Sequence, residues 1–134
     1  MTGADEGGGR MRVAMRGLGR SFGYAFAGIG YLFRSQRNAR IHAGAATGVL
    51  GLGLWLGLPA RDWAVLVLTI GMVLAAEGFN TAIEATVDRF GPERHPLAGT
   101  AKDVAAGAVL LTALAAVAVG LLLLGPPLLL RLSS

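Results

Sequence analysis

Hydrophobic positions in this chain gather into three long runs separated by short polar segments. Only one residue within the runs, His42, is titratable. A helix of about 20 apolar residues spans the hydrocarbon core of a bilayer. The middle run, from Trp63 to Ala76, is too short to cross alone, so its helix must continue through the polar residues that follow. The pattern therefore predicts three transmembrane helices, at about 41–58, 63–90 and 102–125.

Glycine and proline mark the predicted helix ends. Gly91-Pro92 follows the second helix and Gly125-Pro126-Pro127 follows the third. Proline lacks the backbone N–H group that continues a helix, so both segments are predicted to be breaks. In the polar turn between the first two helices, Asp62 is predicted to cap the helix that starts at Trp63.

The segment before the first run has a different pattern, which predicts an amphipathic helix at about 14–38. Its larger apolar residues recur at steps of four and three, at Phe22, Phe26, Ile29 and Phe33, with arginines around them. That spacing puts the apolar residues on one face, as in a helix lying at the membrane surface. Packing of the same face against the protein itself is equally compatible with the pattern. Residues 1–9 are Gly-rich and acidic and are predicted to be a disordered tail, which leaves 10–134 as one domain.

Composition supports an all-α integral membrane protein. The chain is 54% hydrophobic and 15% charged, and it has no cysteine, so disulfides and thiolate metal sites are excluded. The net charge of +4 comes mainly from arginines beside the apolar runs. Attraction to anionic lipid headgroups explains this placement better than nucleic-acid binding, which we do not expect.

The distribution of Lys and Arg predicts the orientation in the membrane. Seven precede the first run and three lie between the second and third, whereas the other two connections have one each. The positive-inside rule places the N-terminus and the 89–102 segment on the cytoplasmic side of the cell (inner) membrane, where nucleotides are available.

Four polar residues of the second helix share one narrow stripe. At about 100° per residue, Glu77, Asn80, Glu84 and Asp88 fall within about 80° of one another. Magnesium is usually held by one or two carboxylates and substrate phosphates, which suits Glu84. Glu77 lies about 10 Å deeper, where a carboxylate suits the role of general base on a buried hydroxyl.

Across the loop, Lys102 and Asp103 are predicted to open the third helix. Unpaired N–H groups and the helix dipole would favour a phosphate there, with Lys102 as a point charge. Simpler interpretations exist for each residue alone: Asp103 as an N-cap, Lys102 as an interface anchor, His95 as an ordinary loop residue. Glu84 and Arg40 could likewise form an intramembrane ion pair. The conjunction of these groups favours a functional site, since ionisable groups within a membrane are functional by default.

Two stretches carry a resemblance to a known family. They read E-G-F-N-T-A-I-E-A-T-V-D at 77–88 and H-P-L-A-G-T-A-K-D-V-A-A-G-A-V-L at 95–110, with weaker similarity at 21–29 and 37–42. The chain resembles the small prokaryotic diacylglycerol kinase/undecaprenol kinase family from Ser21 to about Gly120. The resemblance implies a surface helix, three crossing helices and a homotrimer with active sites between subunits. It also implies that ATP, with Mg²⁺, phosphorylates a lipid alcohol.

The resemblance also implies roles for individual residues. Glu77 matches the catalytic base and Asn80 the polar residue one turn on, and Arg40 is assigned with Glu77 to the lipid substrate. Glu84 matches a metal-binding carboxylate. The residues that match nucleotide contacts are Tyr24, Glu93, Arg94, His95, Lys102 and Asp103.

One position departs from the family pattern. Where a second metal-binding glutamate is usual, this chain has Gln36, which offers a carbonyl oxygen but no charge. Gln36 is therefore expected to be a weak ligand for the metal and its nucleotide. It motivates an alternative function, a catalytically weak family member with a lipid-binding or scaffold role. A proton or ion carrier ranks last, because the outer halves of the predicted spans have no ionisable group.

The R-I-H and H-P-L-A versions of the motifs resemble the undecaprenol kinase branch. Undecaprenol is therefore the favoured acceptor and diacylglycerol the next.

Overall fold

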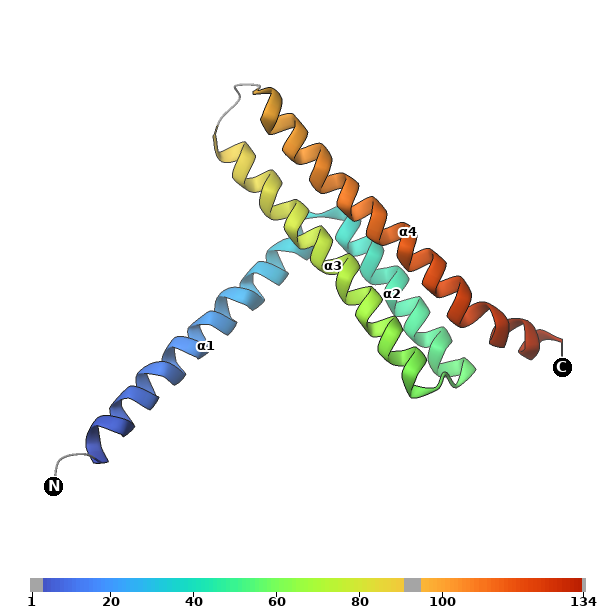
Figure 1. Cartoon of the computed structure of the whole chain (residues 1–134), viewed down its shortest axis with the longest axis horizontal. Coiled ribbons are helices and arrows are strands. Elements are labelled where there is room, and N and C mark those ends of the chain that lie inside the picture. Colours follow the sequence, from blue (N-terminus) through green and yellow to red (C-terminus); the bar gives the residue numbers. More distant parts are fainter. Residues whose placement is uncertain (1–3, 91–94, 134) are drawn as a thin grey trace. The chain divides into compact units, whose positions relative to one another are not determined.

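The computed structural model describes residues 4–90 and 95–133, with side chains from residue 17 onward. These residues are helical apart from short turns, as predicted (Figure 1). The helices are α1 (Ala4–Ser35), α2 (Arg37–Leu56), α3 (Ala60–Arg89) and α4 (Pro96–Leu132). The chain divides into two units, Met1–Ser35 and Gln36–Ser134, and each is described by itself.

The first unit is the single helix α1, which differs from the prediction at both ends. It begins at Ala4, inside the segment predicted to be a disordered tail. Glycine lowers helix propensity by about 1 kcal/mol relative to alanine but does not exclude a helix, so the Gly-rich composition was a weak signal. The helix ends at Ser35 because Gln36 has an extended backbone, with φ −104° and ψ 119°.

The second unit consists of α2, α3 and α4 lying side by side (Figure 1). A tight turn joins α2 to α3, and Gly57 ends α2 in the left-handed conformation, with φ 70°. Only glycine adopts that conformation without a steric cost from Cβ. The Gly57 and Leu58 N–H groups donate to Leu54 and Gly53 carbonyls, at 3.2 Å each, and so pair the last carbonyls of α2.

The capping role predicted for Asp62 is wrong. Helix α3 begins at Ala60 after the N-cap Pro59, which has no side chain able to cap. Asp62 therefore lies within the first turn, where its backbone N–H donates to the Pro59 carbonyl. Its carboxylate accepts a hydrogen bond from Arg61 Nε at 3.2 Å.

The apolar core of this unit lies near the α2–α3 turn. Leu58, Leu66 and Leu124 are buried together there, and side chains from all three helices pack around them. Gly53 allows the close approach of the turn, since a Cβ at this position would lie 3.1 Å from atoms of both Leu58 and Trp63. The core therefore sets the position of α4 against the turn that joins the other two helices.

Helix α4 is longer than predicted in both directions. It begins at Pro96, and it continues through Pro126 and Pro127 to Leu132, so the predicted stop at these prolines is wrong. A proline removes one backbone hydrogen bond but its fixed φ of about −65° is compatible with a helix, and apolar residues continue beyond it. The extension brings Arg131 over the ring of Trp55 in α2, 5.2 Å from its centroid.

Two of the described helices, α3 and α4, are long and apolar enough to cross a membrane. In the most apolar window of each, only 22% and 6% of the residues are buried inside the chain. So much exposed apolar surface is unusual for a water-soluble monomer. Helix α2 does not reach the same hydropathy, because glycine, alanine and its polar first turn dilute its leucines. The prediction of three crossings therefore stays a prediction.

Candidate active site

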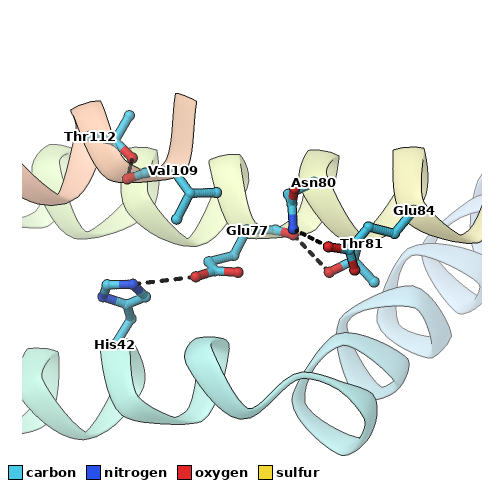
Figure 2. Close-up of polar contacts among 7 residues, drawn as sticks. All are labelled: His42, Glu77, Asn80, Thr81, Glu84, Val109 and Thr112. Atoms are coloured by element: carbon cyan, nitrogen blue, oxygen red, sulfur yellow. Dashed lines mark hydrogen bonds and ion pairs between the residues drawn. The ribbon is translucent and has the colours of Figure 1, made fainter. Parts of the chain in front are cut away.

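Glu77 is the most deeply buried charged side chain of the described residues, with 2% of its surface exposed. It projects from α3 toward His42 on α2, and the two side chains point at each other in Figure 2. Glu77 Oε1 lies 3.3 Å from His42 Nε2, which is ion-pair distance, and His42 is 27% exposed. The buried carboxylate thus has a titratable partner on a neighbouring helix.

The same oxygen of Glu77 lacks a hydrogen bond. Its contact with His42 does not have hydrogen-bond geometry, and no other described residue donates to it. Nearby, the Thr81 hydroxyl donates to the Glu77 backbone carbonyl at 2.8 Å instead of to the carboxylate. An unpaired buried oxygen costs free energy, so such groups in native proteins usually await a ligand or a water.

Glu84 lies two turns further along α3 and is held by two amides. Gln36 Nε2 donates to Oε2 at 3.2 Å, and Asn80 Nδ2 donates to Oε1 at 3.1 Å. Asn80 Oδ1 is buried without a hydrogen-bond partner in the described chain. Three of the predicted site residues are therefore brought together, and each has at least one side-chain oxygen.

This cluster fits a hard divalent cation. Magnesium takes oxygen ligands and is usually held by one or two carboxylates together with substrate phosphates. Glu84 supplies one carboxylate, and the free Asn80 oxygen and the amide oxygen of Gln36 are neutral ligands of the right kind. Among the described residues, no three His, Cys, Asp or Glu side chains converge on one point. A metal held here therefore depends on the amides or on oxygens from a substrate.

Lys102 and Asp103 do not open a helix, contrary to the prediction. Since α4 begins at Pro96, their backbone N–H groups lie inside the helix and are paired there. The N-cap is His95, whose Nδ1 accepts a hydrogen bond from the Leu97 N–H at 3.2 Å. A phosphate resting on unpaired amides at 102–103 is excluded.

Lys102 instead forms an ion pair across the helices. Its Nζ lies 2.5 Å from Asp88 Oδ1, with Lys102 36% and Asp88 66% exposed. The pair joins the last turn of α3 to the second turn of α4. Asp103, the neighbouring predicted residue, is exposed on α4.

The remaining predicted site residues are Tyr24, Arg40, Glu93 and Arg94. Tyr24 belongs to the separate α1 unit and is exposed, and Arg40 is exposed on the first turn of α2. Glu93 and Arg94 lie outside the described residues.

Two apolar hollows flank the polar stripe of α3. One is a groove of about 720 Å³ between α3 and α4, with Asn80 and Thr100 as its polar lining residues. The other is a cavity of about 440 Å³ among α2, α3 and α4, with His42 and Thr69 as its polar lining residues. Each is large enough for a stretch of lipid chain.

The sequence pattern does not identify His42 as the partner of Glu77 or Asp88 as the partner of Lys102. The short turn between the two helices is the signal for the first pair, because it makes α2 and α3 antiparallel neighbours. It does not give the rotation of each helix. The two residues of the second pair lie 14 positions apart on different helices, and the sequence does not specify how these helices meet.

Comparison with known proteins gives consistent matches over most of the chain. The sequence pattern of the family described as prokaryotic diacylglycerol kinase matches residues 23–124. A diacylglycerol kinase of Synechocystis is 52% identical over 81% of this chain, and the match spans 63% of that protein's length. An undecaprenol kinase of Bacillus subtilis is 43% identical over 81% of this chain and 89% of its own length. A diacylglycerol kinase of Escherichia coli is 33% identical over 73% and 80% of the two chains.

Proposed function

Because the chain belongs to the prokaryotic diacylglycerol kinase family, we propose that it is a lipid kinase that transfers the γ-phosphoryl group of ATP to a membrane lipid alcohol. Undecaprenol is the favoured acceptor and diacylglycerol the next. Relatives named for either lipid match this chain, so the acceptor has to be determined by assay.

The observation that carries the proposal is the buried Glu77 carboxylate with an unpaired oxygen. A lipid hydroxyl donating to Oε1 would supply the missing hydrogen bond and place its proton on a base. In the transfer, the lipid oxygen bonds to the γ-phosphorus while the bond from that phosphorus to the β–γ bridging oxygen breaks. The electron pair leaves with ADP, and the hydroxyl proton passes to Glu77.

The Glu84 cluster serves the phosphate end of the reaction in this proposal. Glu84, with the Asn80 and Gln36 amide oxygens, would hold Mg²⁺, which neutralises charge on the ATP phosphates. Glu84 lies about 10 Å along α3 from Glu77, so the two carboxylates can act on the phosphate and on the acceptor hydroxyl respectively. The apolar groove beside Asn80 supports the proposal because it offers room for the hydrocarbon part of the acceptor.

Lys102 is proposed to contact the nucleotide, together with Tyr24, His95, Asp103 and, in the undescribed loop, Glu93 and Arg94. Lys102 now neutralises Asp88 at the end of α3, and an exposed ion pair of this kind exchanges partners at small cost. An incoming phosphate can therefore replace Asp88 as the partner of the Lys102 ammonium group.

The membrane arrangement completes the proposal. Helices α2, α3 and α4 would each cross the inner membrane, with the N-terminus and the loop before α4 in the cytoplasm. The apolar surface left exposed by α3 and α4 supports contact with lipid and with further copies in a homotrimer. A non-catalytic scaffold role, motivated by Gln36, is not favoured because these relatives are named as kinases.

The test uses the purified full chain in detergent with labelled ATP, Mg²⁺ and either undecaprenol or diacylglycerol, followed by thin-layer separation of the lipids. We expect a labelled product from undecaprenol. Product from diacylglycerol alone would overturn the acceptor preference and leave the kinase assignment in place. Lack of product from either lipid, with a folded chain, would overturn the proposed activity.

A further inference from the structure

The contact between His42 and Glu77 has no role in the function proposed above. His42 comes from the second turn of α2 and reaches α3, where its Nε2 faces the buried carboxylate at 3.3 Å (Figure 2). Glu77 is only 2% exposed, and burying a carboxylate is costly unless a neighbouring group compensates for the lost hydration. The group that compensates for the burial of Glu77 therefore has to be identified among its neighbours.

Among the described titratable groups of this unit, His42 lies at ion-pair distance from Glu77. Helix α4 has no titratable residue between Asp103 and Arg131, and in α2 His42 is the last titratable residue. In α3 the nearest titratable group is Glu84, which is itself an acid and is occupied by two amides.

A second observation concerns the cavity beside His42. His42 lines the apolar cavity among α2, α3 and α4, whereas Glu77 does not. One side of the imidazole thus faces space in which an apolar chain fits, and Nε2 faces the carboxylate. His42 therefore contacts both this cavity and the oxygen of Glu77 that lacks a hydrogen bond.

We infer that His42 is a positioning residue for Glu77, which holds the buried carboxylate in the orientation that receives the proton of the lipid hydroxyl. The inference rests on the proposed kinase function and adds no covalent step to it. His42 acts through Glu77, by the contact of its Nε2 with the carboxylate, and takes no part in the bond changes. Misplacement of a catalytic group by about 1 Å can lower the rate about a hundredfold. We therefore expect the loss of kcat in a His42 variant to be of up to that size.

The experiment compares His42→Ala and His42→Gln with the unaltered chain in the labelled-ATP assay, with undecaprenol and diacylglycerol as probes. The amide nitrogen of glutamine can occupy nearly the same place as Nε2 of histidine and does not titrate. Thr47→Ala is the matched control, because Thr47 is exposed on the same helix and bonds only to the Ala43 carbonyl, at 2.9 Å.

We expect His42→Ala to lower kcat about tenfold to a hundredfold while the KM values for ATP and lipid change less than about threefold. His42→Gln should recover kcat to within about threefold of the unaltered chain, and Thr47→Ala should have no effect. Far-ultraviolet circular dichroism and gel filtration in detergent check that each variant is folded.

Two results would overturn the inference while leaving the kinase function intact. One is a His42→Ala variant as active as the unaltered chain. The other is a folded His42→Gln variant as slow as His42→Ala, which would mean that histidine acts by titration and not by position. Failure of the unaltered chain to phosphorylate either lipid would instead count against the proposed function itself.

Discussion

Gln36 Nε2 donates a hydrogen bond to Glu84 Oε2 at 3.2 Å, although 48 positions separate the two residues in the chain. The extended backbone at Gln36 ends α1 and turns this side chain toward α3. An uncharged amide thus contacts Glu84 at the position where the resemblance implies a second carboxylate. The one departure from the family pattern thus contacts Glu84, the carboxylate proposed to bind the metal.

Restoring the acid at this position is expected to strengthen metal binding. In Gln36→Glu, a second carboxylate would lie against Glu84, and the two would repel without a cation and bind Mg²⁺ more tightly with it. We expect the Mg²⁺ concentration for half-maximal activity to fall about threefold to tenfold. Asn38→Asp, an exposed site on the first turn of α2, adds the same charge away from Glu84 and should leave the Mg²⁺ titration unchanged.

Replacing the carboxylate of Glu77 is expected to lower kcat without lowering the thermal stability of the chain. Glu77→Gln keeps the shape but cannot accept a proton, so kcat is expected to fall about a hundredfold to ten-thousandfold. The thermal midpoint in detergent should not fall, because the buried charge no longer has to be desolvated. Asp62→Asn makes the same chemical change at the far end of α3, beside Arg61, and should retain full activity. Turnover near the normal rate in Glu77→Gln would remove Glu77 from the role of base.

The Lys102–Asp88 pair can be broken from either side, and the two results should differ. Lys102→Met removes the cation and is expected to raise the KM for ATP about tenfold or more, since charge-assisted hydrogen bonds contribute about 1.5–3 kcal/mol. Asp88→Asn breaks the same contact but leaves the cation free for the nucleotide, so the KM should stay the same or fall. Both changes should alter stability by less than about 1 kcal/mol, because the pair is exposed. Equal KM values in the two variants would show that the ion pair matters only for structure.

Two glycines in α2 give a matched test of the packing at the turn. A Cβ on Gly53 would lie 3.1 Å from Leu58 and Trp63 atoms, whereas a Cβ on Gly48 would meet nothing within 4 Å. Both changes to alanine gain helix propensity of about 1 kcal/mol, but only Gly53→Ala forces its neighbours to move. We expect Gly53→Ala to be less stable than Gly48→Ala by about 1–3 kcal/mol, measured by thermal unfolding in detergent. Equal stabilities would mean that Leu58 and Trp63 adjust freely.

The sequence by itself determined the all-helical class, the polar stripe of α3 and the family, because helical periodicity and the spacing of its motif residues are local properties. It failed at the ends of α4, where Pro126 and Pro127 are strong local signals for a stop and yet the helix continues. Only the tertiary structure decided the partners of the acids: His42 for Glu77, Gln36 with Asn80 for Glu84, and Lys102 for Asp88. Three of these four partners come from another segment, so they depend on how each helix is rotated about its axis. That rotation is set by the packing of Leu58, Leu66 and Leu124 and by the close approach at Gly53, which arise only when the helices meet.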